Sequence, residues 1–173
     1  MGMYTELHYN AELLSSTPLE VLDVLSYMVK AKQDSYRPTL PRHSLFETDR
    51  WGCMLVSNSY YFAADTHSTL RHDAIAKAWF ICIRCNFKNY CGELRKFCEW
   101  IDPYVSANEG EFLGFSRYEN SELPDLIFKQ GNPPPPGRKP APPVGPPIKP
   151  QPAGGRMMTA GYQPLPRSGR TTT

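Results

Sequence analysis

The feature that most constrains this chain is an abrupt change of composition at residue 131. The segment 131–173 holds 13 of the 18 prolines and no acidic residue. Proline fixes φ and has no backbone N–H, so proline at 11 of the 20 positions from Pro133 to Pro152 excludes a helix or an inner strand there. The 173 residues therefore divide into a compact domain, 1–130, and an extended proline-rich tail, 131–173.

The two parts carry opposite charge. The domain has a formal charge of −4 and the tail has +6, which together make the +2 of the whole chain. An acidic domain argues against a protein that coats nucleic acid. No apolar run approaches the length of a membrane span, so we expect no membrane partner.

The spacing of apolar residues predicts an α+β domain. Alternation over 3–13 predicts a strand with one buried face. Helical spacing predicts one helix over 18–30, with Thr17 as its N-cap, and a second helix that Asn89 caps. Residues 77–87 are apolar on both faces, as in an inner strand of a sheet. The other expected strands are short, at 53–56, 59–63, 111–119 and 125–129, with a polar loop over 64–73.

This order of elements is that of the ferredoxin-like (split βαβ) plan with an extra edge strand. In that plan an antiparallel sheet carries two helices on one face. A single helical layer also explains why the strand over 3–13 has a polar face, with Glu6, His8 and Glu12.

Cys82 and Cys85 have the CxxC spacing of many metal and redox sites. They fall within the strand predicted at 77–87, where residues three apart point to opposite faces. A metal knuckle needs a turn at that place, and a redox pair needs a helix N-terminus. We therefore interpret both thiols as reduced core residues and expect no metal.

The polar loop over 64–73 contains four residues that can act as metal ligands or acid–base groups. Its two histidines are five positions apart, unlike the i, i+4 pair of a helical metal site, which favours a solvated loop. No phosphate loop, dinucleotide fingerprint or nucleophile elbow occurs in the sequence, so we expect no enzyme and no cofactor. An enzyme or metal site in this loop is the third hypothesis, and its residues are Asp65, His67, His72 and Asp73.

Nucleic-acid binding is the second hypothesis. In ferredoxin-like RNA-recognition modules, aromatic side chains on the two central strands stack on bases. The corresponding residues here are Trp79 and Phe80, together with Tyr4 and His8 on the first strand. The Lys/Arg-Gly-aromatic signature is missing and the domain is acidic, so burial of Trp79 and Phe80 in the core is the interpretation that we favour.

The tail contains two candidate contacts for a protein partner. Pro133-x-x-Pro136-x-Arg138 has the pattern of an SH3-type ligand. A short apolar cluster near the C-terminus is typical of a docking peptide, and a disordered solubilising tail is the alternative. The residues expected to bind are Met157, Met158, Tyr162, Leu165, Arg167 and Arg138.

Four segments resemble a small family of uncharacterised proteins encoded by bacteriophages and prophages: MYTELHYNAELL, LFETDRW, DAIAKAWFICIRCNFKNY and GEFLGFSRYE. The resemblance covers residues 1–128 and does not extend into the tail. It implies no catalytic residue, and it implies a viral accessory or virion-associated protein, in the bacterial host cytoplasm and in the virion. The leading prediction is therefore a non-enzymatic binding module whose domain and C-terminal arm engage a host or viral protein.

Overall fold

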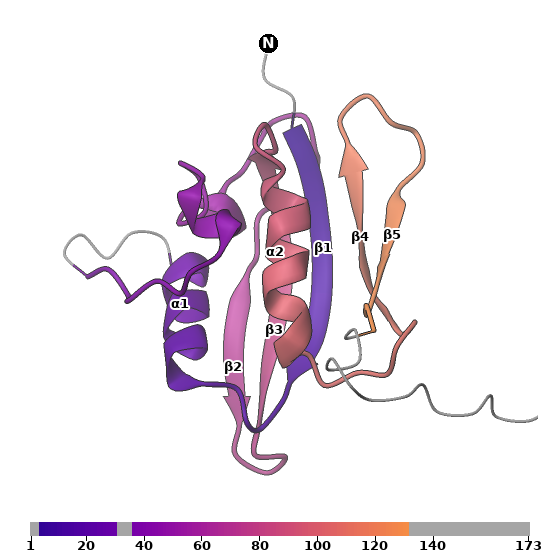
Figure 1. Ribbon diagram of the computed structural model, residues 1–173. Coiled ribbons are helices and arrows are strands. Elements are labelled where there is room, and N and C mark those ends of the chain that lie inside the picture. The colour runs from indigo at the N-terminus through magenta and orange to yellow at the C-terminus, as the bar shows by residue number, and fades with distance from the viewer. Residues whose placement is uncertain (1–3, 31–35, 132–173) are drawn as a thin grey trace, which may run out of the picture. The chain divides into compact units, whose positions relative to one another are not determined.

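The structure is a computed structural model that describes residues 4–30 and 36–131 (Figure 1). The described residues form five strands, two α-helices and three short 3₁₀ helices. The extended tail predicted from the sequence lies outside the described residues, which end at Gly131. The elements are β1 (Tyr4–Leu13), α1 (Leu19–Val29), η1 (Ser44–Glu47), η2 (Met54–Val56), β2 (Thr69–Asp73), β3 (Ala78–Lys88), α2 (Glu93–Ile101), η3 (Asp102–Tyr104), β4 (Phe112–Tyr118) and β5 (Asp125–Phe128).

All five strands belong to one antiparallel sheet with the order β2-β3-β1-β4-β5. β1, the first strand of the chain, is central and pairs with β3 along its whole length, from Tyr4 opposite Lys88 to Leu13 opposite Trp79. β3 lies between β2 and β1, which confirms the inner strand predicted over 77–87. The domain is therefore α+β, with a five-stranded antiparallel sheet and two helices, as the sequence predicts.

Both helices pack on the same face of the sheet. Their buried side chains share one hydrophobic core with the odd-numbered residues of β1 and β3, and α2 lies in front of these strands in Figure 1. In the register of the two strands, Leu7 lies opposite Cys85 and Tyr9 lies opposite Ile83, and all four are buried. The even-numbered residues of β1 and β3 form the opposite face, which we call the open face.

The second strand along the chain is not where the sequence predicts it. Residues 54–56 form the 3₁₀ helix η2, residues 59–63 form no strand, and β2 lies in the segment predicted as a polar loop. β2 is an edge strand with mostly exposed side chains, so it lacks the apolar alternation by which a strand is recognised in a sequence. The turn to β3 is closed by Asp73, whose Oδ1 accepts hydrogen bonds from the backbone N–H groups of Ile75 and Ala76.

The two helix caps differ from their predictions. The Thr17 hydroxyl donates to the carbonyl oxygen of Leu14 at 2.7 Å, so it closes a turn after β1 and does not cap α1. The Asn89 side chain does accept from the backbone N–H of Leu94 at 3.0 Å, although Gly92 is the residue at the N-cap of α2. In the described part of the chain, no helix is long and apolar enough to cross a membrane.

Candidate functional site

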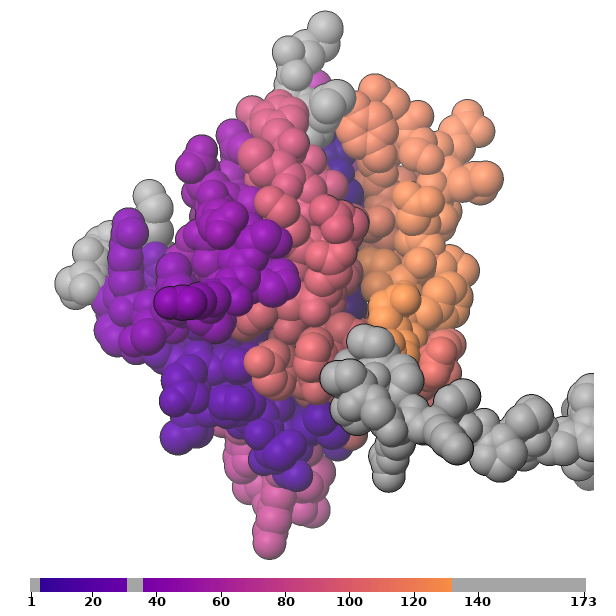
Figure 2. Space-filling model, in the orientation of Figure 1, coloured from indigo at the N-terminus to yellow at the C-terminus, as the bar shows by residue number. Residues whose placement is uncertain are grey.

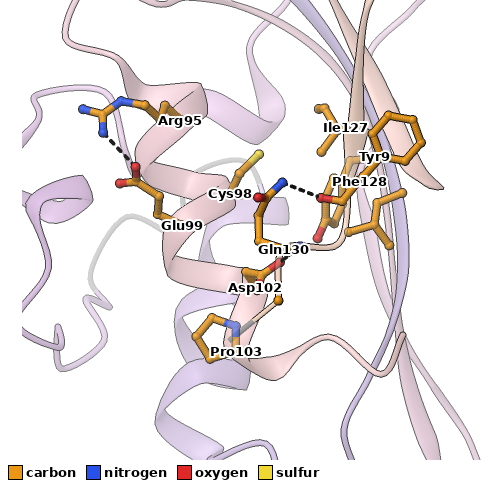
Figure 3. Close-up of a pocket in the computed structure, with 11 residues that line it drawn as sticks. Tyr9, Arg95, Cys98, Glu99, Asp102, Pro103, Ile127, Phe128 and Gln130 are labelled. Carbon is orange, nitrogen blue, oxygen red and sulfur yellow. Dashed lines mark hydrogen bonds and ion pairs between the residues drawn. The ribbon is translucent and has the colours of Figure 1, made fainter. Parts of the chain in front are cut away.

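A pocket of about 460 Å³ lies on the helix-covered side of the sheet, between α2 and the β4–β5 hairpin (Figure 3). Figure 2 shows the same region from outside, with a narrow strip of β1 between α2 and the hairpin. Tyr9 of β1 and Cys98 of α2 line the pocket, and Leu113 of β4 and Ile127 of β5 add apolar walls. Because Tyr9 of β1 is distant in the sequence from α2 and the hairpin, no local motif predicts this pocket.

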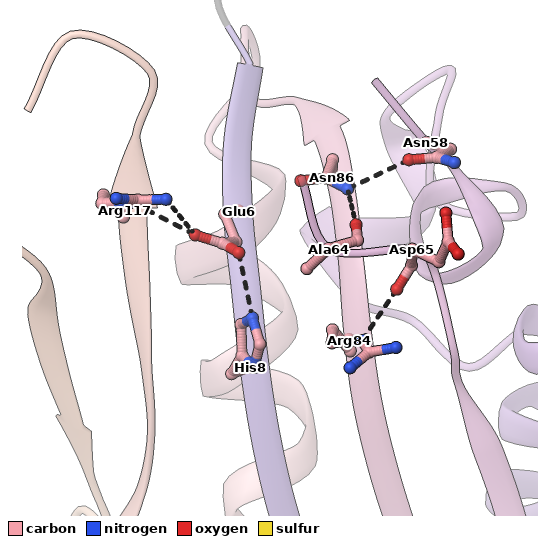
Figure 4. A network of polar contacts seen from close by, with 8 residues as sticks. All are labelled: Glu6, His8, Asn58, Ala64, Asp65, Arg84, Asn86 and Arg117. Atoms are coloured by element: carbon pink, nitrogen blue, oxygen red, sulfur yellow. Dashed lines mark hydrogen bonds and ion pairs between the residues drawn. The ribbon is translucent and has the colours of Figure 1, made fainter. Parts of the chain in front are cut away.

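On the open face, Glu6 is the centre of a polar network (Figure 4). Its carboxylate forms an ion pair with Arg117 of β4, with Nη2 and Oε2 3.0 Å apart, and a hydrogen bond with His8 Nε2, also at 3.0 Å. The guanidinium carbon of Arg117 lies 5.3 Å from the centre of the Phe62 ring. Both Glu6 and Phe62 are buried, so the loop that carries Phe62 covers this end of the open face.

The loop that carries Phe62 is hydrogen-bonded to the part of β3 that extends beyond its pairing with β2. His67 and Arg84 exchange two backbone hydrogen bonds, at 2.7 and 3.0 Å. The Arg84 Nε group donates to the carbonyl oxygen of Asp65 at 2.7 Å, and the Asn86 amide donates to the side-chain oxygen of Asn58 at 3.2 Å (Figure 4). The segment that the sequence suggests as a solvated loop is therefore hydrogen-bonded to the sheet.

The structure does not gather the four residues of the third hypothesis into one site. His67 pairs with β3 through its backbone, and Asp73 closes the β2–β3 turn. His72 packs against Trp79 on the helix-covered side, with ring centroids 5.0 Å apart. Among the described residues, no three His, Cys, Asp or Glu side chains are grouped as a metal site requires.

Three of the four residues of the second hypothesis share the open face. Tyr4 and His8 on β1 and Phe80 on β3 are even-numbered residues of paired strands. Trp79 is on the other face and packs against the helix-covered core, so it does not share a surface with the other three. The reason is that adjacent residues of a strand point to opposite faces.

Cys82 and Cys85 point to opposite faces, as predicted, but only Cys85 is a core residue. Burial raises the pKa of the Cys85 thiol. Cys82 is exposed on the open face, which corrects the prediction that both thiols are buried. No helical layer covers the open face, so the Cys82 side chain stays in contact with solvent.

Apolar side chains gather on the open face of β4 and β5. Phe115 lies opposite Leu126, and Phe112 lies opposite Phe128, so the four side chains share one face. The exposed fractions of Phe112, Leu126 and Phe128 are 55%, 57% and 40%. The His8 ring stacks on Phe115 at a centroid distance of 4.5 Å, which shows that this face is the open one. We call Phe112, Phe115, Leu126 and Phe128 the apolar patch.

A β-bulge allows Phe112 and Phe115, three residues apart, to face the same way. The register of β4 against β5 shifts between Phe112 and Gly114, which inserts one extra residue into β4. A Cβ atom on Gly114 would lie 2.0 Å from the carbonyl oxygen of His8. Only glycine permits this approach of β4 to β1, so Gly114 helps to place the apolar patch.

A groove of about 360 Å³ adjoins the patch near the end of β1. Its lining includes Phe112 of the patch and Phe80 of β3, with Asn10 and Glu12 of β1 between them. The groove therefore connects the apolar patch to one of the aromatic residues of the second hypothesis.

The residues predicted to bind a partner from the tail, Arg138 and those from Met157 to Arg167, lie outside the described residues. The apolar patch is not apparent from the sequence, because 111–119 and 125–129 contain apolar residues at odd and even positions alike, a pattern typical of buried strands. The succession of Leu126, Ile127 and Phe128 was nevertheless an indication of the patch. In a sheet of this order the last strand is an edge strand, and three apolar residues in succession place an apolar side chain on each of its faces.

No protein-family model matches this chain, and no curated protein or solved structure is significantly similar to it. The function is therefore inferred from the residues of this chain and their geometry.

Proposed function

We propose that this protein is a non-enzymatic binding module whose domain binds a protein partner through the apolar patch of β4 and β5. The observation that carries the proposal is the joint exposure of Phe112, Leu126 and Phe128 on one face. Full burial of such a side chain contributes roughly 1.5–3 kcal/mol. Clusters of exposed apolar side chains commonly mark surfaces that a partner covers, and aromatic residues dominate the energy of such interfaces.

The backbone of β5 offers the same partner a second kind of contact. Lys129 exchanges backbone hydrogen bonds with Gly110 and Glu111, on the side of β4. The backbone N–H and C=O groups of successive residues in a strand point to opposite sides. Those of Leu126 and Phe128 therefore point to the outer edge of the sheet. The Phe128 carbonyl oxygen indeed accepts a hydrogen bond from the Gln130 side chain at 3.2 Å. A partner strand at this edge would combine backbone pairing with contact to the apolar patch.

We infer that the architecture is the ferredoxin-like, split βαβ plan with β5 as its extra edge strand. The chain passes from β1 through α1 to β2, and β3 lies between these two strands in the sheet. It passes from β3 through α2 to β4, and β1 lies between those two. Both passages follow the split βαβ pattern, which leaves one face of the sheet available for binding.

The resemblance of residues 1–128 to phage and prophage proteins supports a viral context. On that basis we propose a phage accessory or virion-associated protein that acts in the bacterial host cytoplasm and in the virion. Its partner is then a host factor or a sister viral protein.

The tail is proposed as the second contact with the same partner. Its apolar residues Met157, Met158, Tyr162 and Leu165 supply the contact, and Arg138 and Arg167 supply positive charge at the rim. A proline-rich connection loses less conformational entropy on binding than a flexible one.

Nucleic-acid binding is the second candidate, because three aromatic side chains share the open face. Three arginines of that face argue for a protein instead. Arg117 and Arg71 are each paired with a carboxylate at 3.0 Å, and Arg84 donates to a backbone oxygen. Affinity for a phosphate backbone comes largely from cations that are free to replace counterions, so these engaged arginines favour the protein partner.

Affinity capture with tagged full-length chains tests the proposed surface. The Leu126→Ser, Phe128→Ser double variant removes two exposed side chains of the apolar patch, and we expect captured protein to fall at least about tenfold. Ile75→Ser is the matched control, because Ile75 is 97% exposed at the β2–β3 turn, away from the patch. A Tyr162→Ala, Leu165→Ala variant tests the contribution of the tail in the same way.

Capture from lysate of infected and uninfected host cells is quantified by mass spectrometry, after circular dichroism confirms that each variant is folded. Undiminished capture by the patch variant would show that the apolar patch is not the binding surface. Recovery of nucleic acid that is released as salt rises, with no protein partner, would support the second candidate.

A further inference from the structure

The pocket between α2 and the β4–β5 hairpin is lined by a tyrosine whose hydroxyl forms no hydrogen bond with another described residue. Tyr9 lines this pocket and is 1% exposed. Its ring packs edge-on against Phe97, with centroids 5.9 Å apart. Within residues 4–30 and 36–131, no hydrogen bond joins the Tyr9 hydroxyl to another residue. The hydroxyl is not among the fully buried polar atoms that lack a partner, so it is accessible from the pocket and can donate to a group bound there.

Two of the polar groups that line the pocket, the Tyr9 hydroxyl and the Cys98 thiol, are hydrogen-bond donors at neutral pH. Burial, together with the nearby negative charges of Asp102 and Glu99, raises the pKa of the Cys98 thiol to about 12. Burial also raises the pKa of the Tyr9 hydroxyl above its ordinary value. Both groups therefore keep their protons, and the stronger donor of the two is the Tyr9 hydroxyl.

The charged groups around the pocket are already paired with one another. Asp102 Oδ2 lies 2.6 Å from Lys129 Nζ, and Arg95 Nη1 lies 2.7 Å from Glu99 Oε1. These four groups leave no net charge to attract an ionic ligand. The remaining lining is largely apolar, which favours a ligand with an apolar body.

We propose that this pocket binds a neutral, mainly apolar small molecule that presents one hydrogen-bond acceptor to the Tyr9 hydroxyl. Its volume of about 460 Å³ lies within the range of roughly 300–1,000 Å³ that is usual for ligand pockets. Phe128 belongs to the apolar patch and also lines this pocket. The pocket can still be tested separately from the proposed protein contact, because Tyr9, Cys98 and Ile127 are not part of the patch.

Three probes of similar shape separate the parts of this proposal. Acetophenone has an aromatic ring and one neutral acceptor, ethylbenzene has the ring without the acceptor, and benzoate carries a charge. Each is titrated into the ¹⁵N-labelled full chain at millimolar concentration, and the amide shifts of Cys98, Asp102 and Ile127 are followed. We expect saturable shifts with acetophenone, about three- to tenfold weaker binding of ethylbenzene, and at least about tenfold weaker binding of benzoate.

Tyr9→Phe keeps the ring and removes only the hydroxyl. The affinity for acetophenone should fall to that of ethylbenzene, while the affinity for ethylbenzene stays unchanged. Tyr60→Phe, at an exposed tyrosine, is the matched control and should change neither affinity. The absence of saturable shifts with both neutral probes, or an equal loss for both in Tyr9→Phe, would overturn the proposal.

A second variant keeps the test decisive if Tyr9→Phe does not fold. Ile127 is half-buried on the edge strand β5, so Ile127→Trp can fill the pocket from its wall without disturbing the centre of the core. Binding of acetophenone and ethylbenzene should then be lost together. Unchanged binding of both would place them elsewhere and refute the site.

Discussion

The two edges of the sheet have opposite surface chemistry. On its open face, β2 presents Thr69, Arg71 and Asp73. On the same face, β5 presents Leu126 and Phe128. Charged side chains on an edge strand hinder pairing with a second chain, whereas an apolar edge favours it. The contrast is consistent with the contact proposed at β5, because among the described residues only that edge combines unpaired backbone groups with exposed apolar side chains.

Each edge also has an ion pair, and burial distinguishes the two pairs. Near β5, Lys129 and Asp102 are 2.6 Å apart, and their side chains are only 8% and 12% exposed. On β2, Arg71 and Asp73 are 3.0 Å apart, and their side chains are 62% and 29% exposed. A buried pair leaves an uncompensated charge when one partner is lost, whereas water and salt screen an exposed pair. The β5 end should therefore depend far more on its pair than the β2 end does.

The largest expected effect comes from Lys129→Ala. It leaves the Asp102 carboxylate poorly compensated, so we expect the free energy of unfolding to fall by about 3 kcal/mol. Arg71→Ala is the matched change at the other edge and should cost less than about 1 kcal/mol. Urea denaturation followed by circular dichroism measures both. Equal losses for the two variants would contradict the role assigned to burial.

Gly114→Ala should have the next largest effect, because its new Cβ would collide with the His8 carbonyl oxygen and separate β4 from β1. We expect a loss of at least about 2 kcal/mol, with faster amide exchange in β4 and β5 but not in β2. Gly110 has φ of +79° and open space around it, so Gly110→Ala should cost only about 1 kcal/mol. A greater loss at Gly110 than at Gly114 would show that close strand approach is not what requires glycine here.

The smallest effect concerns acid and the β2 edge. Hydrogen bonds from the backbone N–H of Ala76, from Arg71 and from the backbone N–H of Ile75 hold the pKa of Asp73 below its ordinary 3.8. Because the pKa is lower in the folded state, the ionised carboxylate stabilises the fold at pH values above the ordinary pKa. That contribution is lost as the pH falls through the lower pKa of the folded state. Asp73→Asn should therefore reduce the loss of stability between about pH 5 and pH 2.

Thermal unfolding of the wild type and of Asp73→Asn at several pH values measures that difference. Asp125→Asn, at the exposed start of β5, is the control for removal of one carboxylate from the other edge. The same acid response in the wild type and in Asp73→Asn would show that the turn does not depend on the ionised form.

The strongly periodic elements could be predicted from the sequence, because the apolar residues of each element repeat at the spacing of its buried face. Alternation in β1 and helical spacing in α1 and α2 identify those elements to within a few residues. The doubly apolar run of β3 identifies an inner strand, and strand geometry alone sets Cys82 and Cys85 on opposite faces. These features depend only on neighbours along the chain.

Other features depend on contacts between distant residues, which local patterns do not record. β2 is a strand because β3 supplies its hydrogen-bond partners, and Lys129 is buried because Asp102, 27 residues earlier, lies beside it. The bulge at Phe112 and Gly114 decides which side chains of β4 share a face with those of β5. The sequence alone therefore determined which segments become helices and inner strands. Only the tertiary structure decided which apolar residues are covered, because covering a face requires a second layer from another part of the chain.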